Sequence, residues 1–124
     1  MEAGRVVIFE DDRFFSERAA RIIQADSTHT VVATADTLDG ALEVVVQMAT
    51  GELERDAVVL DGNLTPDATD GFDARAIAQA IRSAALSVKL VGFSLGRMST
   101  YGVDVDVDLG KQNTRDIRRV IDDL

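Results

Sequence analysis

Asp61 directly follows a short apolar run, residues 57–60, and precedes a polar stretch that holds the only proline of the 124-residue chain. Apolar runs rich in β-branched residues that stop at turn signals are typical of buried strands in a parallel sheet. The carboxyl ends of such strands line the ligand crevice of open α/β sheets. Asp61 is therefore predicted to lie where these folds carry out their chemistry, although this stretch alone is interpreted equally well as a strand with a turn-capping aspartate.

Further polar side chains follow the other apolar runs. The first run ends at Glu10 and Asp11, the fourth ends at Ser94, and the fifth leads to Lys111. Because parallel strands bring their carboxyl ends to one edge of the sheet, we expect these side chains near Asp61. Carboxylates gathered at one place repel one another and raise one another's pKa values. A hard divalent cation relieves this repulsion, and carboxylate, carbonyl and water oxygens suit Mg²⁺.

Ser94 and Lys111 are hydrogen-bond donors with no obvious structural duty. Together they could hold an anionic group beside Asp61, which suggests phosphoryl chemistry on a carboxylate. The competing interpretation is a surface that is merely rich in acids, as a chain with a formal net charge of −9 would have in any case. Chance is a poor explanation for suitable polar residues at four separate strand ends, so the pattern favours a functional site.

The elements that must position these residues alternate along the chain. Five stretches have the pattern of strands: 5–9, 30–35, 57–61, 88–93 and 103–109, the last from its strict valine–aspartate alternation. Helices are expected over residues 13–25, 38–49, about 72–84 and the last ten residues, but residues 95–101 allow one or two turns at most. Helix caps are placed at Asp12 for the first helix, at Thr37 for the second, and at either Asn113 or Thr114 for the last. This pattern predicts an α/β domain over residues 1–124, a doubly wound five-stranded parallel sheet with a shortened fourth helix.

Composition excludes several kinds of function. The chain has no cysteine, so a disulfide scaffold, a thiolate metal site and a cysteine nucleophile are excluded. Its single histidine, His29, excludes a multi-histidine metal site and is expected at a solvated strand edge. The negative charge argues against nucleic acid as a partner, and no apolar run or signal peptide indicates a membrane. We expect a cytoplasmic protein.

The ordered set of motifs resembles the receiver domains of bacterial two-component response regulators, of the kind that stands alone without an output domain. Residues 7–12, Val-Ile-Phe-Glu-Asp-Asp, are similar to the acidic cluster of that family, and Asp61 stands at the phosphoacceptor position. Residues 64–66 and 70–71 resemble the loop into the third helix. The resemblance covers the whole chain and implies a flavodoxin-like and CheY-like (βα)5 fold.

The resemblance also implies roles for the candidate residues. Asp61 would take a phosphoryl group from a histidine kinase or phosphotransfer protein, and Ser94 and Lys111 would bind the phosphoryl oxygens. Four residues would hold Mg²⁺: Asp11 and Asp61 directly, Asn63 through its backbone carbonyl and Glu10 through water. The added charge would shift a surface that a downstream protein reads, and hydrolysis would reset it, so we expect a phosphoacceptor rather than a turnover enzyme.

The chain departs from the family's pattern at several positions. Gln112 stands where proline usually follows the lysine in a cis peptide, so a trans peptide is expected here. Leu95 stands where a small residue follows the serine, and Asp108 replaces an aromatic switch residue three positions before Lys111. We therefore expect phosphoryl acceptance to be kept and the usual aromatic readout to be lost.

Two other functions compete with this one. A degenerate receiver would fold in the same way and bind proteins without being controlled by phosphorylation. Residues 61–65, Asp-Gly-Asn-Leu-Thr, also resemble the nucleophile motif of haloacid-dehalogenase-type phosphatases, but Asn63 replaces the general acid and the chain has no room for a cap domain. A calcium loop over residues 104–115 is rejected, because Leu109 and Arg115 stand where glycine and glutamate are needed.

Overall fold

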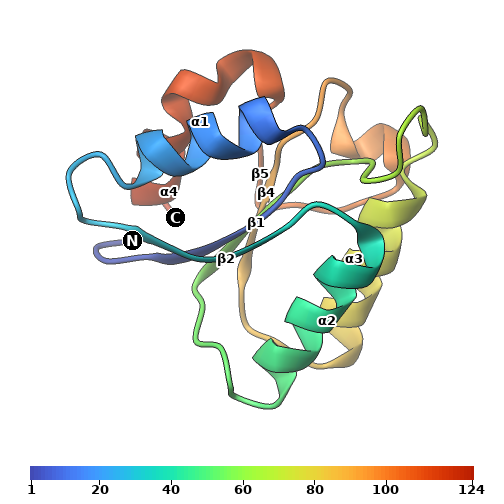
Figure 1. Cartoon of the computed structure of the whole chain (residues 1–124), viewed down its shortest axis with the longest axis horizontal. Coiled ribbons are helices and arrows are strands. Elements are labelled where there is room, and N and C mark those ends of the chain that lie inside the picture. Colours follow the sequence, from blue (N-terminus) through green and yellow to red (C-terminus); the bar gives the residue numbers. More distant parts are fainter.

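The computed structural model describes all 124 residues and contains a parallel sheet with helices on both faces (Figure 1). The strands are β1 (Arg5–Phe9), β2 (Thr30–Ala35), β3 (Ala57–Leu60), β4 (Lys89–Gly92) and β5 (Val107–Asp108), in the order β2-β1-β3-β4-β5. The helices are α1 (Arg13–Ile23), α2 (Leu38–Ala49), α3 (Phe72–Ser83) and α4 (Ile117–Asp122), with two 3₁₀ segments, η1 (Met98–Tyr101) and η2 (Lys111–Asp116). The predicted doubly wound α/β fold is confirmed. None of the helices combines the length and the apolar character that crossing a membrane would require.

The three inner strands β1, β3 and β4 are buried on both faces, which explains why they read as mainly apolar runs. Along β1, Val7 and Phe9 belong to the core under α2 and α3, whereas Val6 and Ile8 belong to the core under α1 and α4. Figure 1 shows these two pairs of helices on opposite sides of the strands. The predicted caps at the first two helices are confirmed, since the side chains of Asp12 and Thr37 accept hydrogen bonds from backbone N–H groups in the first turns of α1 and α2.

The register of the sheet aligns the carboxyl ends of its strands. The last residues of four strands pair across the sheet: Phe9 with Leu60, Leu60 with Gly92, and Gly92 with Asp108. The segments that leave these strands therefore emerge together at one edge. This alignment brings polar residues of distant sequence to one place.

The connection between β4 and β5 contains only η1, so the predicted shortening of the fourth helix is confirmed. The predicted strand over residues 103–109 is too long, because β5 contains Val107 and Asp108 alone. Asp108 Oδ2 accepts a hydrogen bond from the Met98 N–H of η1 at 2.9 Å. Before β5, Asp106 Oδ2 accepts a hydrogen bond from the Leu90 N–H of β4 at 2.7 Å. A carboxylate thus takes the place of a strand carbonyl.

The predicted cap of the last helix is wrong. Asn113 Nδ2 donates to the Leu109 carbonyl and the Thr114 hydroxyl donates to the Lys111 carbonyl, so both side chains stabilise the 3₁₀ segment η2. The helix α4 begins later, at Ile117, without a side-chain cap. The peptide bonds are all trans, as expected for the one before Gln112.

His29 is not solvated, contrary to expectation. It is 1% exposed, because α4 covers the start of β2. Its Nδ1 accepts a hydrogen bond from the Gly4 N–H at 2.8 Å, and its Nε2 lies 2.6 Å from Asp122 Oδ1. Since Nδ1 accepts, the ring proton is on Nε2 and is donated to the carboxylate. His29 therefore joins β2 to α4 at the sheet edge opposite the aligned carboxyl ends.

Candidate functional site

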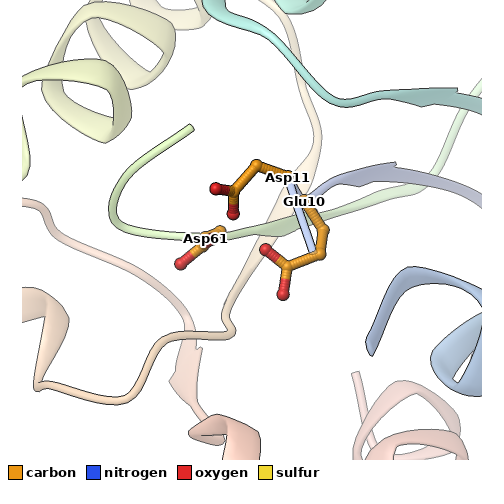
Figure 2. Close-up of side chains that lie close together, drawn as sticks. All are labelled: Glu10, Asp11 and Asp61. Carbon is orange, nitrogen blue, oxygen red and sulfur yellow. The ribbon is translucent and has the colours of Figure 1, made fainter. Parts of the chain in front are cut away.

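Three carboxylates converge at the carboxyl edge of the sheet (Figure 2). Glu10 and Asp11 directly follow β1, and Asp61 directly follows the adjacent β3. Each offers an oxygen that lies within 4.8 Å of the other two. Glu10 and Asp61 are 1% and 3% exposed, whereas Asp11 reaches solvent. Two parallel strands in register thus position one acidic cluster, in which two carboxylates are buried and one is exposed.

Lys111 is the cation of this cluster. Its Nζ lies 2.6 Å from Glu10 Oε1 and 3.1 Å from Asp61 Oδ2, and it stands 5.1 Å from the ring centroid of Phe15. Its backbone N–H donates to the carbonyl of Ser94, which ties the start of η2 to the end of β4. The aliphatic part of the side chain is buried, and the ammonium group reaches both carboxylates.

The charges in the cluster do not balance. Burial raises the pKa of Glu10 above the usual carboxyl range, and the neighbouring Asp61 carboxylate raises it further against the opposing effect of Lys111. Burial and the Asp61 carboxylate also raise the pKa of Asp11. Burial by itself would lower the pKa of Lys111, but the Glu10 and Asp61 carboxylates outweigh it and raise that pKa. One ammonium group therefore stabilises three acids only in part.

The donor set fits a hard divalent cation. Glu10 Oε2 is buried and accepts no hydrogen bond, which is costly for a carboxylate oxygen. All three side chains of the cluster offer oxygen, the ligand atom that Mg²⁺ prefers. The side-chain oxygen of Asn63 already accepts a hydrogen bond from the Gly71 N–H at 2.8 Å, so the backbone carbonyl is the oxygen of this residue that a cation could use.

A crevice of about 260 Å³ opens onto the cluster. Its lining includes Asp11, Asp61, Asn63, Ser94, Tyr101 and Lys111. Five of the six residues predicted from the sequence therefore share one cavity, and Glu10 lies behind it at the buried end of the carboxylate cluster. Asp12, the third acid of the first motif, is exposed and caps α1 instead.

Two residues at the site were missed by the sequence reasoning. Asp73, in the first turn of α3, is buried, and its Oδ2 accepts hydrogen bonds from the Leu64 N–H, the Thr65 N–H and the Thr65 hydroxyl at 2.8 to 3.0 Å. It thereby fixes the loop that carries Asn63. An acidic residue at a helix start is usually a cap, so its spacing gave no signal of this long-range role.

Tyr101 is the second residue that was missed. It ends η1, and its ring lies against the backbone of Gly62, the neighbour of Asp61. Its hydroxyl lies 3.5 Å from the buried hydroxyl of Ser94. The sequence offered one indirect signal: a glycine directly follows Asp61, and another directly follows Leu95.

The same fold occurs in solved receiver domains. The chain is similar to the receiver domain of the putative response regulator NarL from Mycobacterium tuberculosis, with a TM-score of 0.76 and 24% identity over 99% of this chain and 96% of that one. It is also similar to a LuxR-family DNA-binding response regulator from Staphylococcus aureus (TM-score 0.73, 18% identity, 97% of each chain). A third neighbour is the phosphorylated cyanobacterial phytochrome response regulator RcpA (TM-score 0.73, 17% identity, 95% of this chain and 91% of that one).

Models of protein families give no match to the chain, and curated proteins give none. The structural likeness is nevertheless complete along the chain. The protein has the fold of a response-regulator receiver domain, as its ordered motifs predicted.

Proposed function

We propose that this receiver fold is a phosphoacceptor in a two-component phosphorelay, in which Asp61 takes a phosphoryl group from a histidine kinase or phosphotransfer protein. One observation carries the proposal: Lys111 Nζ lies 3.1 Å from Asp61 Oδ2 at a crevice that Asp11 and Ser94 also line. A carboxylate, a second acid, an ammonium group and a hydroxyl are together the groups that phosphoryl transfer to a carboxylate needs.

Asp61 supplies the nucleophile. Lys111 contacts Oδ2, which leaves Oδ1 as the oxygen that attacks phosphorus. The phosphorus–nitrogen bond of a phosphohistidine breaks as the new phosphorus–oxygen bond forms, and its electron pair stays on the imidazole nitrogen. The carboxylate attacks as an anion, so no proton has to leave Asp61. The leaving imidazole nitrogen takes up a proton from solvent, so the products are an acyl phosphate on Asp61 and a neutral, free histidine on the donor.

Other residues of the crevice hold the transferred group. The Lys111 ammonium and the Ser94 hydroxyl are donors placed to bind phosphoryl oxygens, and both side chains are buried enough to be pre-oriented. Asp11, Asp61, the Asn63 backbone carbonyl and, through water, Glu10 would hold Mg²⁺. When bound, Mg²⁺ supplies neutralisation of the charge on acceptor and phosphoryl oxygens. The unpartnered Glu10 Oε2 supports this assignment.

The outcome of the reaction is a change of charge at the sheet edge rather than a released product. Water then hydrolyses the acyl phosphate, so the protein acts as a phosphoacceptor that resets itself and not as a turnover enzyme. A downstream protein, in the cytoplasm, would read the altered surface. One structural neighbour, RcpA, is described as a phosphorylated response regulator, which supports the proposal by analogy.

Intact-mass measurement tests the proposal. The protein is incubated with Mg²⁺ and phosphoramidate, and one phosphate adduct is expected, which Asp61→Asn abolishes. Asp12→Asn is the matched control, because an asparagine also caps α1 and Asp12 lies outside the crevice. No adduct in the unmodified chain would favour a degenerate, phosphorylation-independent module. Steady release of phosphate from many phosphomonoesters would instead indicate a phosphatase.

A further inference from the structure

Tyr101 fills a space that three glycines leave open beside the Asp61 crevice. A β-carbon added at Gly62, Gly71 or Gly96 would come within 2.5, 2.3 and 2.7 Å of atoms of the Tyr101 side chain. Real β-carbons essentially never make contacts this short. The three glycines lie on two separate segments of the chain, one after β3 and one after β4. The ring therefore packs directly on backbone beside the crevice that it lines, and any side chain at these positions would displace it.

The main chain of Tyr101 is held firmly on both sides. Arg75 Nη1 donates to the Tyr101 carbonyl at 2.9 Å and to the Asp70 carbonyl at 2.6 Å, which joins the end of η1 to the loop before α3. At the start of η1, the Met98 N–H donates to Asp108 Oδ2. The 3₁₀ segment is thus fixed at both ends, and the side chain of Tyr101 is presented to the crevice from a defined position.

The hydroxyl group of Tyr101 has a weak contact with Ser94. The two oxygens are 3.5 Å apart, which is beyond the usual distance of an O–H···O hydrogen bond. A phosphoryl oxygen beside Asp61 would offer the Ser94 hydroxyl a charged acceptor, and bonds to charged acceptors are shorter and stronger. The Ser94 hydroxyl would then turn from Tyr101 towards the anion.

We propose that Tyr101 is the gate of the Asp61 crevice and the neighbour that the Ser94 hydroxyl leaves when an anion binds. Its ring limits the size of the phosphodonor that reaches Asp61, and its hydroxyl loses the weak contact with Ser94 when the crevice is occupied. This inference rests on the proposed phosphoacceptor function and adds to it the residue that senses an occupied crevice. Asp108, which stands where an aromatic residue was expected, contributes by fixing the η1 segment that carries this tyrosine.

A single spectroscopic probe tests the sensing role. The chain has one tyrosine and no tryptophan, so protein grown with 3-fluorotyrosine gives one ¹⁹F resonance, that of Tyr101. Addition of beryllofluoride with Mg²⁺, a non-covalent mimic of the phosphoryl group, is expected to shift this resonance in a saturable manner. Asp61→Asn should abolish the shift. An unmoved resonance in a protein that does form a phosphoramidate adduct would overturn the inference and leave the proposed function standing, whereas no adduct would overturn both.

Donor selectivity tests the gate. Tyr101→Ala should raise the rate of adduct formation from phosphoimidazole several-fold relative to the rate from the smaller phosphoramidate. Tyr101→Phe keeps the ring and should keep the wild-type ratio. Gly96→Ala should displace the ring and reproduce the effect of Tyr101→Ala, with no further increase in the double variant. An unchanged ratio in Tyr101→Ala, with Asp61 still phosphorylated, would overturn the gate.

Discussion

The Lys111 ammonium group lies 2.6 Å from Glu10 Oε1, and both side chains are buried at the acidic cluster. The two residues are far apart in the sequence. They meet because the start of η2 and the end of β1 lie at the same edge of the sheet. The contact leaves Glu10 Oε2 without a partner and engages only one of the two oxygens of Asp61. The site is therefore short of positive charge.

Replacing Lys111 with methionine should destabilise the metal-free protein. The change leaves two buried carboxylates without a cation, and removal of one partner of a buried ion pair costs about 3 kcal/mol. Urea unfolding measures the loss, and added Mg²⁺ should recover part of it by restoring positive charge. Lys89→Met is the matched control, since Lys89 is the other lysine of the chain and is exposed at the start of β4. Equal losses in the two variants would contradict the prediction.

The stability of the metal-free protein should fall as the pH rises above the ordinary carboxyl range. Burial and the Asp61 carboxylate raise the pKa of Glu10 in the folded state above its ordinary value of 4.5. At pH values between 4.5 and the raised pKa of Glu10 in the folded state, the folded protein binds more protons than the unfolded protein. Deprotonation with rising pH therefore favours unfolding.

The expected decrease from about pH 6 to about pH 8 is on the order of 1 kcal/mol in the free energy of unfolding. Urea unfolding at the two pH values measures it. Glu10→Gln should flatten this dependence, whereas Glu43→Gln on the exposed face of α2 should leave it unchanged. A dependence that persists in Glu10→Gln would assign the effect to other groups.

Mg²⁺ should raise the melting temperature, and more so at higher pH. A ligand that binds only the folded state stabilises it in proportion to the logarithm of its concentration over the dissociation constant. Protons compete with the cation at Glu10 and Asp11, whose pKa values are raised, so affinity should increase with pH. Asp11→Ala should remove the thermal shift and Asp12→Asn should retain it. A shift that survives in Asp11→Ala would contradict the assignment of this residue as a metal ligand.

Replacing His29 with alanine should weaken the fold without affecting the site. The change removes the contacts of the ring with the Gly4 N–H and Asp122 and leaves the buried Gly4 N–H unpaired, at an expected cost of about 2 kcal/mol in urea unfolding. Because His29 lies at the opposite edge of the sheet, the yield of phosphate adduct in native conditions should stay at the wild-type level. A large loss of adduct from a folded variant would show that His29 has a role in the reaction.

The strands and the acidic residues could be predicted because their signals are local. Residues 6–9 and 57–60 are apolar throughout since both faces of these strands are covered, and the polar residue after each run marks the point where a buried strand ends. Parallel pairing then requires Glu10 and Asp61 to share an edge, whatever the details of packing. The same reasoning brought Ser94 and Lys111 to the site.

The errors concern residues whose state depends on distant partners. His29 is buried because α4 packs over it, and the Asp106 side chain rather than a strand carbonyl accepts the Leu90 N–H of β4 where a longer β5 would pair. Neither contact has a signature in the neighbouring sequence. The 3₁₀ segment η2, which took the place of a capped helix start, is likewise stabilised by side chains that turn back to carbonyls of its own loop.

The sequence by itself determined the order of strands and helices, the acidic cluster and the position of Asp61 at a strand end, because hydrophobic period and residue type encode these features locally. Only the tertiary structure decided what surrounds Asp61. It placed the Lys111 ammonium between Glu10 and Asp61, fixed the Asn63 loop through Asp73 and brought Tyr101 over the crevice. The physical reason is that these contacts join segments far apart in the chain, and their distances exist only once the sheet has aligned the ends of its strands.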